Sequence, residues 1–218
     1  PTAYLNRKEA RRMDRFAQFS LIASQQAVKQ ANLNIDDSNR NQVGVLIGNG
    51  AGGLTTLQDQ VINMFKNGPD RVNPFLVPMM IADSASAQVS ILLGARGPNF
   101  CSTSACSSSA DSIGIAYETI KRGDTKAMIA GGSEAPINAI GIAGFCSCKA
   151  LSGRNDSPQE ASRPFDADRD GFVIGEGAAA FILEDYESAV KRGAEIYGEI
   201  IGGGMSSDAY HMTAPDPE

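Results

Sequence analysis

The sequence has 218 residues, enough for one large domain or two small ones, and its 42% hydrophobic and 20% charged residues are ordinary for a globular protein. A net charge of −6 argues against nucleic acid as the main partner, and no segment approaches the roughly 20 apolar residues that span a bilayer, so we expect no membrane insertion. The opening Pro1-Thr2-Ala3 shows no charged and apolar leader, so we expect a cytoplasmic protein with reduced cysteines.

The first hundred residues predict helices separated by one short strand. Residues 6–31 have apolar side chains at helical spacing, and Asn6 can cap a long amphipathic helix there. Residues 43–47 predict a buried strand, which is followed by a helix over residues 54–67 and another over residues 79–93. Basic side chains crowd the first turns of the first helix; they fit an ordinary solvated face or a docking patch for an acidic partner.

The glycine-rich turn at residues 48–53 follows a strand and precedes a helix, an order that resembles a phosphate-binding loop. Its spacing matches neither the dinucleotide fingerprint nor the P-loop, and no Lys-Ser/Thr pair follows. We therefore interpret the glycines as sites where backbone or ligand approaches closely.

The second half of the chain alternates strands and helices. Strands are expected at residues 99–103, 127–130, 171–183 and 195–202, and helices at residues 106–122, 137–144 and 185–192, with a polar loop at 151–170. Such alternation predicts an α/β fold with helices packed on the faces of a sheet.

Cys106 stands where a strand gives way to a helix, among small residues that leave space for a substrate. The N-terminus of a helix offers unpaired N–H groups and a positive dipole end, which favour the nucleophilic thiolate. The same residue also fits a buried structural cysteine. Cys146 and Cys148 are spaced too tightly for a usual zinc site and the chain has one histidine, so we expect no metal.

Several motifs together resemble the β-ketoacyl-acyl-carrier-protein synthases, most closely the synthase II type of dissociated fatty-acid synthesis. They lie at residues 7–17 (RKEARRMDRFA), 103–109 (TSACSSS), 131–134 (GGSE), 150–156 (ALSGRND), 162–166 (SRPFD), 169–177 (RDGFVIGEG) and 206–213 (SSDAYHMT).

The resemblance implies a thiolase-like α/β fold, layered α-β-α-β-α, of which residues 1–218 form most of the N-terminal half without its first strand. It implies that Cys106 accepts an acyl chain from acyl carrier protein, and that a decarboxylative condensation with malonyl-carrier protein then extends the chain. The substrates are covalently attached to the carrier's phosphopantetheine, so the resemblance implies no separate cofactor. The intact enzyme is expected to be a homodimer.

The same resemblance implies roles for further residues. Ala51 is expected to line the acyl pocket, and His211 and Thr213 are expected to contact pantetheine. Glu134 and Asp166 are interpreted as structural acids that pair with Arg163 and Arg169. The expected docking residues for acyl carrier protein are Lys8, Arg11, Arg12, Arg71 and Lys149.

The family also uses two later histidines, whereas this sequence holds only His211. We therefore expect an interior fragment that is inactive alone. The alternatives are a polyketide ketosynthase and a non-catalytic structural fragment. The presence of Cys106 opposes a chain-length partner, in which that cysteine is normally replaced.

Overall fold

A computed structural model describes residues 4–211 and 213–217, and four strands of this part form one sheet. The strands are β1 (Val43–Gly48), β2 (Asn99–Phe100), β3 (Ala127–Glu134) and β4 (Gly177–Glu184). Their order is β2-β1-β3-β4; β1 runs parallel to β2 and β3, and β4 runs antiparallel to β3. All six residues of β1 are buried, as expected for a central parallel strand covered on both faces.

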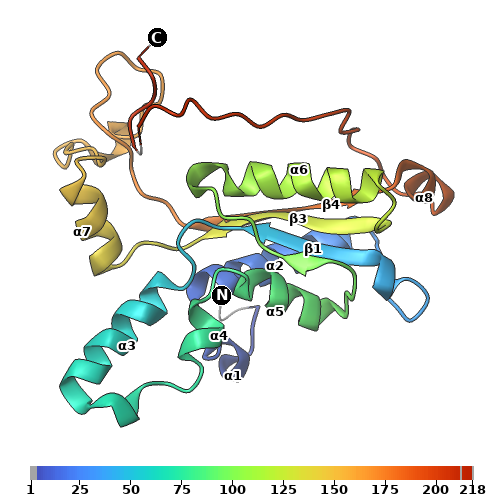
Figure 1. Cartoon of the computed structure of the whole chain (residues 1–218), viewed down its shortest axis with the longest axis horizontal. Coiled ribbons are helices and arrows are strands. Elements are labelled where there is room, and N and C mark those ends of the chain that lie inside the picture. The colour runs from blue at the N-terminus through green and yellow to red at the C-terminus, as the bar shows by residue number, and fades with distance from the viewer. Residues whose placement is uncertain (1–3, 212, 218) are drawn as a thin grey trace.

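Helices cover both faces of the sheet, which confirms the α/β class (Figure 1). On one face lie α2 (Arg15–Gln30) and α5 (Ser84–Leu93), and on the other lies α6 (Ser108–Lys121). Alternate strand residues point to opposite faces. Val45, Ile47 and Ile129 pack with Phe16, Leu21 and Val89 on the first face, whereas Leu46, Met128 and Ala130 pack with Ala116 on the second.

Glycines let α6 approach the strands closely. A Cβ on Gly48 would lie 2.2 Å from the carbonyl oxygen of Ser108, and one on Gly132 would lie 1.7 Å from Ser109 Oγ. Both distances are far below van der Waals contact, so larger residues would push α6 off the sheet. This confirms the close-approach interpretation of the glycine at the start of the 48–53 turn.

The single helix predicted over residues 6–31 is wrong, because the chain breaks into α1 (Arg7–Ala10) and α2. Asn6 does cap α1, its Oδ1 accepting from the N–H of Glu9 at 2.9 Å. The break falls at Asp14, whose extended backbone and side chain form the cap of α2. Its buried carboxylate also accepts from the N–H and hydroxyl of Thr56 at 2.8 and 2.6 Å, so one side chain joins the starts of α2 and α3 (Leu54–Asn67).

Other boundaries also differ from the sequence prediction: the strands expected over residues 99–103, 127–130 and 171–183 are Asn99–Phe100, Ala127–Glu134 and Gly177–Glu184. The helix expected over residues 79–93 divides into α4 (Leu76–Met80) and α5, because Ile81 has extended backbone. The strand expected over residues 195–202 is wrong: this segment is irregular and exposed. It crosses the outer face of α6, where Tyr117 donates to the carbonyl of Ile201 at 3.3 Å, and no strand edge lies there to pair with it.

The remaining elements lie at the periphery. They are α7 (Ala139–Ser147), α8 (Tyr186–Lys191) and the 3-10 turns Arg40–Gln42, Pro69–Arg71, Ala105–Ser107 and Pro158–Glu160. Within residues 4–211 and 213–217, no helix combines the length and apolar character needed to cross a membrane. The described residues leave out Pro1, Thr2, Ala3 and Met212. The expectation that no leader is present rested on the first three, and Met212 is part of the last motif.

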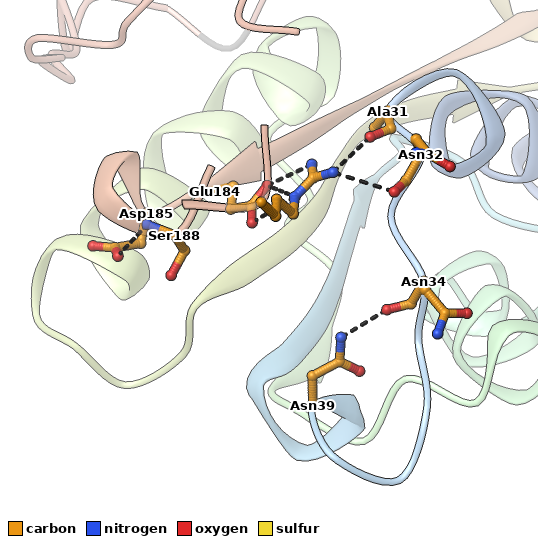
Figure 2. Close-up of polar contacts among 8 residues, drawn as sticks. Ala31, Asn32, Asn34, Asn39, Glu184, Asp185 and Ser188 are labelled. Atoms are coloured by element: carbon orange, nitrogen blue, oxygen red, sulfur yellow. Dashed lines mark hydrogen bonds and ion pairs between the residues drawn. The ribbon is translucent and has the colours of Figure 1, made fainter. Parts of the chain in front are cut away.

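Arg192 ties the end of β4 to the end of α2. Its guanidinium pairs with both carboxylate oxygens of Glu184 at 2.7–2.9 Å and donates to the carbonyls of Ala31 and Asn32 at 2.8 and 3.2 Å. Figure 2 shows these contacts converging from β4 and from the turn after α2. A cation that satisfies the last carbonyls of a helix also complements the negative end of its dipole.

Candidate active site

The carboxyl ends of the three parallel strands β1, β2 and β3 meet at one edge of the sheet, the usual place for a ligand site in an α/β fold. The 48–53 turn follows β1 and Glu134 ends β3. Residues 104–107, which we call the elbow, connect the segment after β2 to α6. The N–H of Asn49 donates to the carbonyl of Ser102 at 3.3 Å, and this bond joins the 48–53 turn to the segment after β2.

Cys106 lies exposed in the elbow, within the 3-10 turn Ala105–Ser107 that directly precedes α6. Ala105, immediately before it, has φ of 51°, a left-handed conformation that is strained for a residue with a side chain. The alternative of a buried structural cysteine is wrong. A strained turn that presents an exposed thiol at the start of a 14-residue helix is instead suited to nucleophilic attack.

Ser108 holds the elbow in this conformation. Its hydroxyl is buried, accepts from the N–H of Ser104 at 2.9 Å and donates to the carbonyl of Ala105 at 2.7 Å. Ser104 in turn donates to the carboxylate of Asp111. The sequence shows the serine-rich run but does not distinguish Ser108 from its neighbours, because only the backbone path decides which hydroxyl points inward.

The other cysteines have different surroundings. All four are free. Partial burial raises the pKa of the Cys101 thiol; a contact with Thr103 opposes this effect and the charge of Asp83 adds to it. Cys146 and Cys148 are exposed near the end of α7, the carbonyl end of that helix. Only Cys106 therefore combines exposure with a helix N-terminus.

A basic hollow of about 480 Å³ opens beside α1. Arg12 lies over the ring of Phe75, 4.9 Å from its centroid, so part of the wall is a cation stacked on an aromatic face. The predicted docking residues Arg71 and Lys149 are exposed but do not line this hollow. The lining residues are Arg7, Lys8, Arg11, Arg12 and Phe75. Phe75 was not predicted, because about sixty residues separate it from the arginines in the sequence.

The segment that contains His211 and Thr213 runs back along α6 toward the elbow. Ile201 meets Tyr117 near the C-terminal end of α6, and Met205 Cε would lie 3.7 Å from a Cβ on Gly114, one turn closer to Cys106. The segment can be followed across α6 in Figure 1. His211 Nδ1 accepts from the N–H of Thr213 at 3.1 Å, a contact within its own segment.

The predicted pairing of the acids is partly wrong. Glu134 accepts from the backbone N–H groups of Gly50 and Ala51, and Arg163 pairs instead with Asp170 at 3.9 Å. Arg169 contacts Asp166 through the backbone carbonyl at 2.8 Å. Ala51 is exposed on the turn beside the elbow, so the turn and Cys106 share one surface.

These features define an α/β protein with an exposed cysteine on a strained turn at the carboxyl edge of its sheet. Residues 2–189 match the N-terminal domain of β-ketoacyl synthase. The chain therefore belongs to the β-ketoacyl synthase family, as the sequence motifs indicated.

Similar proteins agree with this assignment. The chain is 54% identical over 217 residues to the 3-oxoacyl-[acyl-carrier-protein] synthase 2 of Synechocystis sp., covering 100% of this chain and 52% of that protein. A β-ketoacyl synthase structure from Burkholderia phymatum has a TM-score of 0.88 at 37% identity, over 98% of this chain and 52% of that one. The neighbours are thiolase-like ketosynthases, so the predicted fold is confirmed.

A second structural neighbour is a type II polyketide-synthase acyl-carrier protein in complex with its ketosynthase. Its TM-score is 0.75 at 35% identity, over 84% of this chain and 46% of that one. The chain spans about half the length of the curated relatives it matches.

Proposed function

We propose that this chain forms the nucleophile-bearing part of a 3-oxoacyl-[acyl-carrier-protein] synthase that elongates fatty acids. The single observation that supports this most strongly is the exposed Cys106 on a strained elbow at the carboxyl edge of the sheet. Identity to the Synechocystis synthase, at 54%, favours fatty-acid elongation over polyketide synthesis, for which the neighbour is 35% identical.

The proposed first step is a thioester exchange. The thiolate sulfur of Cys106 attacks the acyl carbonyl carbon, and the bond from that carbon to the carrier's pantetheine sulfur breaks. The carrier leaves as a thiol after taking up one proton, and the acyl group remains on Cys106. The N-terminal end of α6 lies where it stabilises negative charge during this exchange.

The proposed second step loses CO2 from a malonyl group and joins its remaining two carbons to the acyl chain. General acid–base groups are needed for it, and His211 is the one histidine in these 218 residues. Its ring contacts Thr213 of its own segment. We therefore propose that residues outside this sequence supply the groups for condensation.

We further propose that an acyl carrier protein docks on the basic hollow, with Lys8, Arg11 and Arg12 meeting its acidic surface and Arg71 and Lys149 adding charge nearby. The complex of a related ketosynthase with its acyl-carrier protein supports this type of partner. Ala51 is proposed to border the acyl chain, and His211 and Thr213 the pantetheine arm. A homodimer in the cytoplasm, without a separate cofactor, stays our prediction for the whole enzyme.

The test is acyl transfer in a full-length protein that contains this sequence. Incubation with an acyl-carrier protein should add one acyl group to the peptide that contains Cys106, detected by mass spectrometry. Cys106→Ser should abolish this product, and the matched Cys146→Ser control, which also changes an exposed cysteine, should leave it intact. Acylation that persists in Cys106→Ser would refute the proposed role.

A further inference from the structure

Glu134 is a half-buried acid that the proposed reaction does not use. It is the last residue of β3, and since Gly132 faces α6, the alternation of the strand turns Glu134 toward that same face. Its Oε2 accepts from the N–H of Gly50 at 2.7 Å and of Ala51 at 3.3 Å. Its Oε1 is buried, and no donor in the described part of the chain reaches it.

The turn that Glu134 holds lies directly against the elbow. A Cβ on Gly50 would lie 3.7 Å from both the Cα and the carbonyl oxygen of Ala105, the strained residue before Cys106. The turn is therefore a direct neighbour of the elbow that carries Cys106.

A second anchor fixes the root of the same turn. The side chain of Asn49 is buried; its Nδ2 donates to the carbonyl of Ala82 at 2.6 Å and its Oδ1 accepts from the N–H of Gly52 at 2.9 Å. Asn49 thus fixes both ends of the turn, and Glu134 alone among the described contacts of Gly50 and Ala51 holds its tip. Bonds from two backbone N–H groups to a carboxylate are stronger than bonds to a neutral acceptor.

We propose that Glu134 is a positioning residue that presses the tip of the Gly50–Ala51 turn against the Cys106 elbow and thereby sets which acyl chains fit beside the nucleophile. The inference rests on the proposed function, because it concerns the acyl chain on Cys106. A turn released from Glu134 can move away from Ala105. The acyl chain on Cys106 is then less confined, so discrimination between acyl chains falls.

The test compares a short and a long saturated acyl-carrier protein as acyl donors to a full-length protein that contains this sequence. The measured quantity is the ratio of kcat/KM for the two donors. Glu134→Ala should change this ratio about tenfold, within the range that pocket contacts with methylene groups provide. Glu134→Gln keeps an oxygen acceptor for both N–H groups and should restore the ratio to within about twofold of the original.

This ratio separates positioning from a purely structural role. Partial unfolding lowers the rates with both donors equally and leaves their ratio unchanged. Where Glu134→Ala does not fold, Glu134→Asp serves instead, since it keeps the charge but withdraws the oxygens by one methylene and should shift the ratio in the same direction.

The two proposals fail in different ways. Absence of acyl-Cys106 in the unmodified protein overturns the proposed function, and this inference with it. Acylation of the unmodified protein together with an unchanged ratio in Glu134→Ala, or in Glu134→Asp, overturns the role of Glu134 alone.

Discussion

A single hydroxyl, that of Ser108, stabilises the strained backbone that precedes Cys106. Replacing it in Ser108→Ala leaves the N–H of Ser104 and the carbonyl of Ala105 without this partner. Lost hydrogen bonds of this kind cost about 1–2 kcal/mol, so we expect acyl transfer to Cys106 to slow roughly tenfold or more. Single-turnover acylation followed by quench and mass spectrometry measures this rate.

The adjacent Ser107→Ala is the matched control, because Ser107 is exposed and its side chain does not hold the elbow. It should change the rate less than about twofold. Equal rates for Ser108→Ala and the unmodified protein would show that the elbow keeps its shape without this hydroxyl.

At the scale of elements, Arg192 joins β4 to the C-terminal end of α2. In Arg192→Met the Glu184 carboxylate, only 10% exposed, loses its partner, and two carbonyls after α2 lose their donor. Because the pair is largely shielded from water, we expect the free energy of unfolding to fall by about 1–3 kcal/mol. Urea unfolding followed by circular dichroism measures the change.

The control for this element is Arg122→Met, which removes an arginine whose partner Asp124 is exposed, with the two side chains 59% and 50% accessible. Such a surface pair contributes about 0–1 kcal/mol, so this variant should be close to the original. A similar loss in both variants would mean that the Arg192 cluster adds no more than an ordinary surface ion pair.

At the scale of the whole molecule, charge is unevenly distributed. The chain has a net charge of −6, yet α1 and the turn after it gather four basic side chains around the hollow. Lys8→Glu with Arg12→Glu should weaken binding of an acyl carrier protein at least about tenfold at low salt and much less at high salt, because exposed charges are screened over about 8–10 Å. Binding titrations at several salt concentrations measure this dependence.

The double variant Lys29→Glu with Lys191→Glu makes the same charge change far from the hollow, at the end of α2 and on α8. It should bind the carrier nearly normally. Equal weakening by both double variants would indicate a general effect of net charge, and the basic side chains beside α1 would then be an ordinary solvated face.

Local sequence determined much of this protein: the α/β alternation, the buried β1, the cap at Asn6 and the strand-to-helix junction at Cys106 could all be predicted, because periodicity, capping and such junctions act over a few residues. The tertiary structure alone decided that Asp14 breaks the first helix by bonding Thr56, and that residues 195–202 cross α6 without forming a strand. It also decided that Glu134 bonds the Gly50–Ala51 turn and has no arginine partner. Those outcomes depend on partners far away in the chain, and no local pattern specifies which distant group will satisfy a buried carboxylate or a free backbone N–H.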